Sequence, residues 1–367
     1  MTDLHEAWFY ERLPDSRVHC TLCPHECRIA DGSRGACAVR YNDRGVLYTL
    51  VYDAVVASNL EPVEKKPFFH FMPGSFAYSI ATVGCNMRCA FCQNWEIAHW
   101  PVEHLPRRLA EGRDSTRVPL DFLAKNVAGR TRSPAAIVED AVRSGASSIA
   151  YTFTEPTIFF ELAYETAVRA RARGLKNLFV TNGYISEVAL RKIAPVLDGV
   201  NVDLKCFRED SYRRISRAGL QPVLDAIRLY HALGVWVEVT TLVIPGVNDS
   251  DRELHDIAQF VRSVGPEVPW HVSQFYPTYK MLDRSITPLD TLRRARQIGL
   301  HAGLQYVYEG NVPGQGGEDT VCYLCGTVLV ERVGSSLVAN RIRKGCCPTC
   351  RSPVHGVGMD QAVRSAA

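Results

Sequence analysis

Short apolar segments alternate with longer amphipathic ones from about residue 75 to residue 308. The short segments are rich in β-branched or aromatic residues and are mostly continuous rather than strictly alternating, which is typical of strands buried on both faces of a parallel sheet. Six segments fit this description: 75–83, 147–152, 177–181, 199–204, 235–243 and 270–276.

The amphipathic segments between them have recognisable helix ends. Ser133 precedes Pro134 as a cap before a proline, and Ser250 with Glu253 has the spacing of a capping box. Glycines at the expected ends predict left-handed caps at Gly145, Gly174, Gly234, Gly265 and Gly303. Six strand–helix units in series predict an α/β fold, either a barrel or a doubly wound sheet, and periodicity does not decide between them.

Two stretches interrupt this rhythm. Residues 100–132 are rich in Arg and Pro and predict a long surface insertion, while the glycine run 310–320 predicts a flexible link into a small C-terminal module. We therefore expect an N-terminal Cys-rich metal-binding module and lead-in over 1–74, the strand–helix units over 75–310 and a zinc-ribbon-like module over 311–367.

Composition narrows the function classes. A formal charge of +3 over 367 residues argues against a nucleic-acid or membrane-surface protein. No apolar run reaches bilayer length, and the polar N-terminus lacks the features of a secretory signal, so we expect a cytoplasmic protein. In a reducing compartment, thirteen cysteines indicate metal binding or redox work rather than disulfides.

Three of these cysteines directly follow the first predicted strand, as Cys85-x3-Cys89-x2-Cys92. Three thiolates can hold three irons of a cubane [4Fe–4S] cluster and leave the fourth iron open for a ligand. The position after a strand places them at the sheet edge where α/β folds carry their sites. Phe91 could shield such a cluster or pack on a nucleobase. The alternatives are a zinc site completed by His99, or three core cysteines.

The stretch CNMRCAFC (85–92) matches the CxxxCxΦC signature, with Φ aromatic, of the radical S-adenosylmethionine (SAM) superfamily. The chain resembles the pyruvate formate-lyase activating enzyme group, and within it most resembles the radical SAM member of the AmmeMemoRadiSam gene set. The closer match is carried by 20–40, 61–75, 84–95, 151–161, 180–184, 201–205 and 270–281. It implies a partial (β/α)6 TIM-type barrel in which the cluster cleaves SAM reductively to methionine and a 5′-deoxyadenosyl radical that abstracts hydrogen from a substrate.

The resemblance also implies residue roles at successive strand ends. Thr154 and Glu155 resemble the Gly-Gly-Glu element that receives the SAM amino group, although Thr154 replaces a glycine. Asp203 and Lys205 match an Asp-x-Lys element that meets SAM. Asn182, His271 on the sixth strand, which is expected to reach the ribose, and Phe91 complete the expected cofactor contacts. Each has a plainer alternative, such as a helix-capping Glu155 or a local Asp203–Lys205 ion pair.

The charged segment 61–71 (EPVEKKPFFHF) precedes the first barrel strand. A run of this kind is usually a solvated turn. The resemblance instead favours a substrate or partner contact for its charged side chains, which are Glu64, Lys65, Lys66 and His70.

Two outer cysteine groups add further candidate metal sites. Cys20, Cys23, Cys27 and Cys37 supply four soft ligands for zinc or an accessory iron–sulfur cluster, and we favour zinc. In relatives of the activating enzymes, accessory clusters that feed electrons usually follow the triplet, whereas this group precedes it. The second group, Cys322, Cys325, Cys347 and Cys350, is close to zinc-ribbon spacing, with Cys346 as an alternative ligand. The lone Cys206 is given no role.

Three functional hypotheses follow. The first is a radical SAM oxidoreductase with AMMECR-like and MEMO-like partners and an electron donor such as flavodoxin or ferredoxin, an implication of the resemblance. The second is a glycyl-radical activase. The third, from another class, is a zinc-dependent nucleic-acid-binding protein, which the near-neutral charge argues against.

Overall fold

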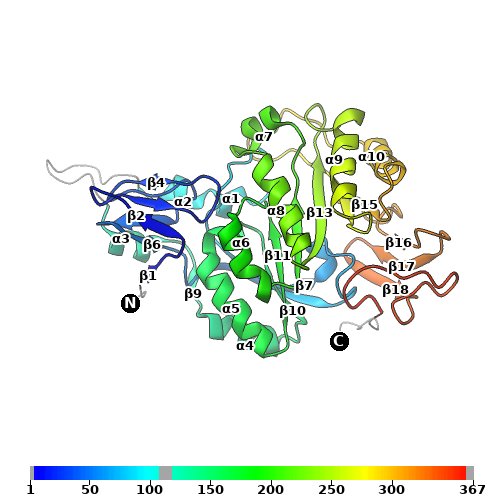
Figure 1. Ribbon diagram of the computed structural model, residues 1–367, viewed down its shortest axis with the longest axis horizontal. Coiled ribbons are helices and arrows are strands. Elements are labelled where there is room, and N and C mark those ends of the chain that lie inside the picture. The colour runs from blue at the N-terminus through cyan, green and yellow to red at the C-terminus, as the bar shows by residue number, and fades with distance from the viewer. Residues whose placement is uncertain (1–3, 107–117, 361–367) are drawn as a thin grey trace.

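The computed structural model describes residues 4–106 and 118–360. Its central feature is a nine-stranded sheet with the order β15-β14-β13-β12-β11-β10-β8-β7-β9 (Figure 1). Parallel pairing joins β8 (Phe76–Thr82), β10 (Ser148–Tyr151), β11 (Lys176–Thr181), β12 (Gly199–Asp203), β13 (Trp236–Val243), β14 (Trp270–Gln274) and β15 (Val307–Gly310). At the other edge, β7 (Ala54–Pro62) pairs antiparallel with β8, and β9 (Arg130–Thr131) pairs antiparallel with β7.

All six predicted strands are present, and the fold is α/β with a parallel-strand sheet. From β8 to β15 the strands follow chain order, so the sheet lacks the reversal that defines a doubly wound fold. The seventh parallel strand, β15, was not predicted. It is only four residues long and includes the charged Glu309, so its sequence does not stand out as a buried strand.

Helices cover one face of this sheet, as the green helices in front of the strands in Figure 1 show. They are α4 (Pro134–Arg143), α5 (Phe160–Ala172), α6 (Glu187–Ile193), α7 (Glu209–Ser216), α8 (Gln221–Ala232), α9 (Asp251–Val264) and α10 (Leu289–His301), with short 3-10 turns η2 (Pro156–Phe159) and η3 (Ala194–Val196).

The predicted helix ends are mostly confirmed. The Ser133 and Ser250 side chains accept hydrogen bonds from the N–H groups of Ala136 and Glu253. Glu253 does not complete a capping box, because its Oε1 accepts the Phe207 N–H at 2.7 Å instead. Gly145, Gly174, Gly234 and Gly303 adopt the left-handed conformation, but the prediction is wrong for Gly265, which is extended with a φ of −177°.

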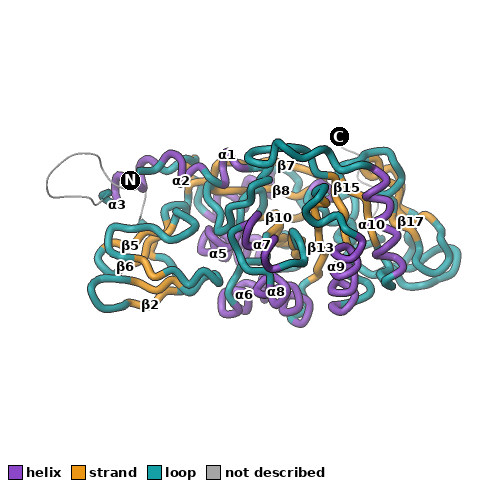
Figure 2. Tube along the Cα trace, turned by 90° about the horizontal axis from the view of Figure 1, so that it is seen from above, coloured by secondary structure: helices purple, strands orange, loops and turns teal. Residues whose placement is uncertain are grey.

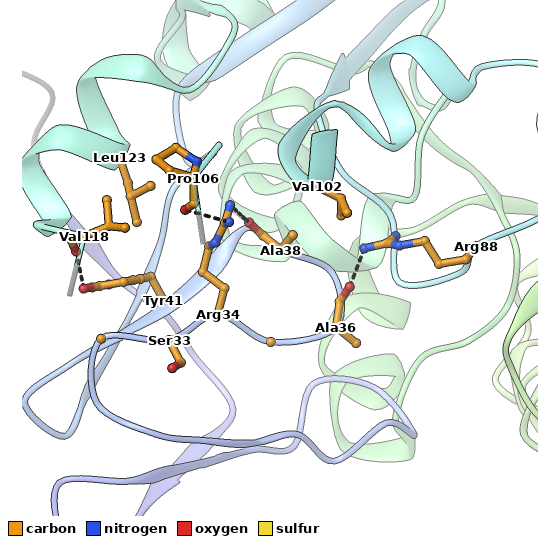
Figure 3. Close-up of a pocket in the computed structure, with 12 residues that line it drawn as sticks. Ser33, Arg34, Ala36, Ala38, Tyr41, Arg88, Val102, Pro106, Val118 and Leu123 are labelled. Carbon is orange, nitrogen blue, oxygen red and sulfur yellow. Dashed lines mark hydrogen bonds between the residues drawn. The ribbon is translucent and has the colours of Figure 1, made fainter. Parts of the chain in front are cut away.

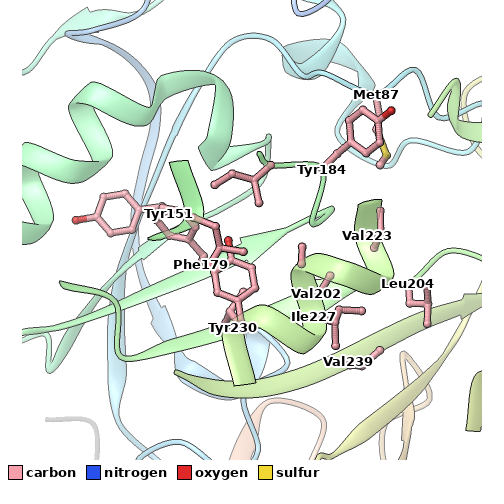
Figure 4. Close-up of a cluster of buried hydrophobic side chains, with 14 of the residues drawn as sticks. Met87, Tyr151, Phe179, Tyr184, Val202, Leu204, Val223, Ile227, Tyr230 and Val239 are labelled. Atoms are coloured by element: carbon pink, nitrogen blue, oxygen red, sulfur yellow. The ribbon is translucent and has the colours of Figure 1, made fainter. Parts of the chain in front are cut away.

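The main core lies between the helices and the sheet. Figure 4 shows Val202 and Val239 of the sheet beside Val223, Ile227 and Tyr230 of α8, and all five are buried. The opposite face of the sheet is also covered, because Phe68 and Phe71 from the segment before β8 pack on Ala77, Ala150 and Leu178. Burial on both faces explains why the strand sequences are continuously apolar.

The N-terminal part forms two small sheets at one end of the molecule, the blue end in Figure 1. One contains β1 (His5–Glu6), β6 (Val46–Thr49) and β5 (Arg40–Asp43), and the other contains β2 (Tyr10–Arg12), β3 (Val18–Cys20) and β4 (Arg28–Ile29). β7 lies within residues 1–74 but belongs to the central sheet.

The stretch 100–132 is not simply a loop. After α1 (Trp95–Ala98) it contains α2 (Trp100–His104), α3 (Leu120–Asn126) and strand β9, and Leu120 and Leu123 of α3 pack on Tyr41 of the N-terminal part. Its residues 107–117 lie outside the described part of the chain.

The C-terminal part lies at the opposite end (Figure 2) and forms a sheet of β16 (Thr320–Val321), β17 (Val328–Val333) and β18 (Ser336–Asn340). The link before it is held by hydrogen bonds, including Glu309 N–H to the Gly317 carbonyl at 3.0 Å. Among the described residues, no helix is both long and apolar enough to cross a membrane.

A buried ion pair fastens the N-terminal part to α5. Both Glu161 oxygens accept from Arg40 Nη2 at 2.8 Å, Glu161 Oε1 also accepts the Trp8 N–H at 2.7 Å, and both charged side chains are 1% exposed. Removing one partner of a buried pair leaves an uncompensated charge, so we expect Glu161→Gln to lower the free energy of unfolding by about 3–5 kcal/mol. Urea denaturation followed by circular dichroism measures this.

The matched control is Glu187→Gln, at an exposed pair with Arg191 on α6, which should change stability by less than about 0.5 kcal/mol. Equal effects of the two substitutions would contradict the anchoring role of Glu161.

Candidate functional site

A cavity of about 400 Å³ opens at the carboxyl ends of the parallel strands. Nine of the ten side chains predicted for the cluster and SAM contribute to its walls: Cys85, Cys89, Phe91, Cys92, Thr154, Glu155, Asn182, Asp203 and Lys205. The volume is within the usual range for a small-molecule site, roughly 300–1,000 Å³. The structure therefore places these nine predicted residues around one cavity at this edge of the sheet.

The three triplet cysteines lie in the loop that leaves β8. Cys85 Sγ accepts from the Met87 N–H at 3.4 Å and from Asn182 Nδ2 at 3.7 Å. No three ligand atoms from Cys85, Cys89, Cys92 and His99, all of them described, lie within 4.8 Å of one another. A single zinc ion needs sulfurs about 3.8 Å apart, so the alternative of a zinc site completed by His99 does not fit. A cubane holds each sulfur on a different iron and suits the wider spacing.

Burial raises the pKa of Cys85 far above its usual value, and it raises the pKa of Cys92 to about 11. A thiol with so high a pKa holds its proton at neutral pH. A metal that binds these sulfurs must therefore displace protons, so its binding is expected to weaken as the pH falls.

Glu155 is fully buried where β10 ends. Its Oε1 accepts from the Thr157 N–H (3.0 Å), Thr157 Oγ1 (2.6 Å) and Thr181 Oγ1 (2.7 Å), and its Oε2 accepts the Asn182 N–H at 2.8 Å. The plainer alternative is thus realised, because Glu155 caps η2. The carboxylate also fixes the neighbouring strand end, so that Asn182 reaches the sulfur of Cys85.

Asp203 and Lys205 form an ion pair on the cavity wall, with Lys205 Nζ 3.1 Å from Asp203 Oδ2. The Lys205 side chain is 11% exposed, and its Nζ lies 5.6 Å from the centre of the Phe91 ring. Burial by itself lowers the pKa of Lys205, but the Asp203 carboxylate outweighs it and raises the pKa above its usual value. Lys205 is therefore a permanent cation beside the triplet.

His271 does not line the cavity. It lies two residues before Ser273, which does, and its Nε2 is 2.7 Å from Glu238 Oε2. Its ring also contacts those of Phe69 and Tyr308. The structure thus places His271 in a buried network beneath the site, away from where a ribose contact was expected.

The same network takes in much of the charged segment 61–71. Glu238 also accepts the N–H groups of Phe69 (3.0 Å) and His70 (2.9 Å), and burial lowers the pKa of His70 to about 4, so that its ring is neutral. Glu64 and Lys66 are also buried. A solvated turn is therefore wrong for this segment.

Several cavity residues were missed by sequence reasoning. Phe153 is one of them, because nothing in its sequence context indicated a site. Lys65 and Lys66 also line the cavity, but the resemblance had already suggested a contact for them. Phe153 has a φ of 63°, uncommon for a residue with a side chain, and its ring lies 4.2 Å from Lys66 Nζ. Thr240 of β13, Ser273 of β14 and Asn311 directly after β15 also line the cavity and look unremarkable in sequence.

The C-terminal cysteines form a compact group. The Sγ atoms of Cys322 and Cys350, and those of Cys325 and Cys347, are 3.6 Å apart, and all four lie within 4.8 Å of one another. This matches the separation of about 3.8 Å expected around one tetrahedral ion. Cys346 is outside the group, so Cys347 is the residue placed for a ligand role.

Comparisons with known proteins agree with this site. The model of the family described as "Radical SAM superfamily" matches residues 79–258, which include the triplet and the ends of β8 to β13. The chain contains a radical SAM superfamily domain. An uncharacterized protein of Methanocaldococcus jannaschii, MJ0808, is 43% identical over 330 residues, covering 90% of this chain and 92% of its own length.

This radical SAM protein is also similar to more distant relatives. A putative glycyl-radical enzyme activating enzyme of M. jannaschii, MJ1227, is 27% identical over 49% of this chain and 65% of its own length. Among solved structures, a domain of pyruvate-formate lyase-activating enzyme from Bacteroides vulgatus aligns at 15% identity over 45% of this chain and all of that domain, with a TM-score of 0.41. Streptococcus suis SuiB bound to SAM aligns at 12% identity over 68% of this chain and 53% of its own, with a TM-score of 0.46.

Proposed function

We propose that this radical SAM enzyme holds a [4Fe–4S] cluster on Cys85, Cys89 and Cys92 and cleaves SAM reductively, so that hydrogen is abstracted from a substrate. The observation that carries the proposal is the meeting of three unpaired cysteines with a buried lysine and a buried carboxylate on one cavity. When bound, the cluster supplies the electron that splits SAM into methionine and a 5′-deoxyadenosyl radical.

The residues fit such a cluster. Three sulfurs, too widely spaced for one ion, leave a fourth iron without a protein ligand, which is the position a reacting cofactor needs. The Met87 N–H and the Asn182 amide donate to Cys85 Sγ, and hydrogen bonds to cluster sulfurs are one means by which proteins set a redox potential.

The cavity walls also suit SAM. Lys205, held by Asp203, offers a cation for the methionine carboxylate, and Glu155 with the carbonyl groups of the 152–154 loop offers acceptors for the amino group. Glu155 already accepts four hydrogen bonds, so we assign it mainly to positioning that loop and Asn182. Phe91, Val180 and Leu242 provide apolar wall that excludes water from the reacting atoms.

We expect Lys205→Ala to weaken SAM binding by about 10- to 100-fold, because a charge-assisted hydrogen bond contributes about 1.5–3 kcal/mol. Equilibrium dialysis of SAM against the anaerobic, reconstituted protein measures this. The matched control is Lys176→Ala, which removes a lysine–aspartate pair with Asp198 that lies outside the cavity lining. Wild-type affinity in Lys205→Ala would exclude the carboxylate-binding role.

For the biological setting we favour the AmmeMemoRadiSam gene set, with AMMECR-like and MEMO-like partners. Its support is that the similarity to MJ0808 covers 90% of this chain, so that it must extend into both outer modules, whereas the similarity to the putative activating enzyme covers about half of the chain. That second relative is the reason to keep a glycyl-radical activase as the alternative, with a protein glycine as substrate.

The proposal extends to the type of barrel, the metal of the C-terminal module and the cellular setting. Strands in chain order suit a partial TIM-type barrel, with modules divided near residues 74 and 310. We assign zinc to Cys322, Cys325, Cys347 and Cys350, from the sulfur spacing. All thirteen cysteines are unpaired, which suits a reducing, cytoplasmic setting with flavodoxin or ferredoxin as the electron donor.

The test is anaerobic reconstitution followed by a dithionite-driven assay for 5′-deoxyadenosine from SAM. We expect a brown, iron-containing protein that forms 5′-deoxyadenosine and methionine in equal amounts. A colourless protein that binds only zinc and leaves SAM intact would overturn the proposal in favour of a zinc-binding module.

A further inference from the structure

The N-terminal cysteine group lies directly against the triplet loop, although some sixty residues separate them in sequence. His25, between Cys23 and Cys27, has its Nε2 2.7 Å from the Asn86 carbonyl oxygen, next to Cys85. On the other side, a Cβ added to Gly84 would lie 3.3 Å from the Cys37 carbonyl oxygen. The two loops are therefore packed together.

A continuous series of hydrogen bonds joins the two groups of sulfurs. The Ala36 N–H donates to Cys27 Sγ at 3.4 Å, the Arg88 guanidinium donates to the Ala36 carbonyl, and the same guanidinium donates to the Cys85 carbonyl at 2.6 Å. Figure 3 shows the Arg88–Ala36 contact across the cavity formed by the 32–38 loop.

The four N-terminal sulfurs are gathered but not compact. The Cys20 N–H donates to the Cys27 carbonyl oxygen at 2.9 Å, and the N–H of Ala36, which precedes Cys37, donates to Cys27 Sγ, so the backbone brings these three cysteines together. No three of the four, which are all described, come within 4.8 Å of one another. The C-terminal group in the same chain does meet that limit, as one zinc ion requires.

Like the triplet, the N-terminal group thus lies outside the limit that the C-terminal group meets. Four thiols around a larger, polynuclear centre would occupy all of its irons and leave no site for a substrate. Cys20 and Cys37 belong to the same buried apolar cluster as Met87, Cys89 and Phe91. Cys23 and Cys27 are half-buried, and a centre whose irons are all held by thiols suits electron storage and transfer.

We propose that Cys20, Cys23, Cys27 and Cys37 hold a second [4Fe–4S] cluster, which passes electrons to the cluster on Cys85, Cys89 and Cys92. The relay rests on the proposed function of the triplet, whereas the second cluster does not. A reduced one-electron donor of the ferredoxin or flavodoxin class is oxidised by one electron and the N-terminal cluster is reduced by it. That cluster is then reoxidised as the triplet cluster is reduced, and no bond or proton is exchanged.

The metal is tested in the full-length triplet variant Cys85→Ala/Cys89→Ala/Cys92→Ala, reconstituted anaerobically with iron, sulfide and zinc. We expect about four iron atoms and about one zinc per chain, with an electron paramagnetic resonance signal after dithionite reduction. A triplet variant with no iron and about two zinc ions per chain would overturn the second cluster, whatever the wild type does to SAM.

Two further changes assign that iron. Adding Cys37→Ser to the triplet variant should remove it and keep the single zinc, which also reports that the chain still folds. Adding Cys206→Ser instead, at a buried cysteine outside the three groups, should leave the iron in place. Iron retained in the Cys37→Ser background would show that it binds elsewhere.

The relay is tested with the triplet intact, by comparing Cys37→Ser with the wild type. Dithionite should reduce the triplet cluster in both proteins, as seen by loss of its visible absorbance. Reduced flavodoxin should reduce it rapidly in the wild type and much more slowly in Cys37→Ser. Equal rates with flavodoxin would exclude the relay.

Discussion

Replacing any one triplet cysteine, as in Cys89→Ala, should reduce 5′-deoxyadenosine formation to the level of a protein-free control. With two sulfurs the cluster site loses one of its three protein-held irons, and no other described cysteine lines the cavity to replace the missing ligand. The measurement is chromatography of the products after anaerobic incubation with SAM and dithionite.

The control for this experiment is Cys206→Ala. Cys206 is fully buried and adjoins Lys205, but its Sγ is 3.7 Å from the Arg208 carbonyl oxygen and does not line the cavity. We expect activity close to that of the wild type. Product formed by Cys89→Ala at the wild-type rate would show that the triplet does not hold the reacting cluster.

The second large effect is expected from Cys347→Ser in the C-terminal module. Within the described residues, the buried apolar cluster there has seven members, so we expect the module to depend on a bound metal for stability. Structural zinc contributes about 10–16 kcal/mol of apparent binding free energy in zinc-finger peptides, and much of it appears as folding free energy. We expect Cys347→Ser to lose the zinc and to be cleaved rapidly by protease within 320–360.

Cys346→Ser is a matched neighbour one residue away. Its sulfur is outside the four-cysteine group, so it should keep the zinc and resist protease like the wild type. Loss of zinc from Cys346→Ser together with its retention in Cys347→Ser would reverse the ligand assignment.

The strands, and the edge of the sheet at which the site lies, could be predicted because both depend on residues that are close together in the sequence. The segment SIAY of β10 is buried at every position, and two-sided burial leaves a continuous apolar run in the sequence. The triplet and the polar residues after β10, β11 and β12 follow those strands directly, so parallel packing brings them to one edge.

The predictions that were wrong concern side chains whose burial and partners depend on residues distant in sequence. His271 and Ser273 share a face of β14, but only the folded chain shows that Ser273 reaches the cavity while His271 meets Glu238. Glu253 has capping-box spacing, yet a backbone N–H from another loop, that of Phe207, takes its side chain.

The interpretation of the charged segment 61–71 as a solvated turn was wrong for a related reason. Charged side chains are usually exposed to solvent, but Glu64 is buried. It accepts the Gly74 N–H at 2.8 Å and lies 3.8 Å from Arg332 Nε of the C-terminal part. A sequence window does not contain such a partner. The contact between the N-terminal cysteines and the triplet loop was likewise out of reach, because the two loops meet only in the folded chain.

We expect an open iron of the triplet cluster to bind SAM in this cavity. The most direct test is electron paramagnetic resonance of the dithionite-reduced Cys37→Ser variant, recorded with and without SAM, so that the triplet cluster alone is observed. We predict a signal whose g values shift when SAM is added, and no such signal when Cys89→Ala is combined with Cys37→Ser. A reduced-cluster signal that SAM leaves unchanged would contradict SAM binding to the triplet cluster. The lack of any reduced-cluster signal in the Cys37→Ser variant would contradict it as well.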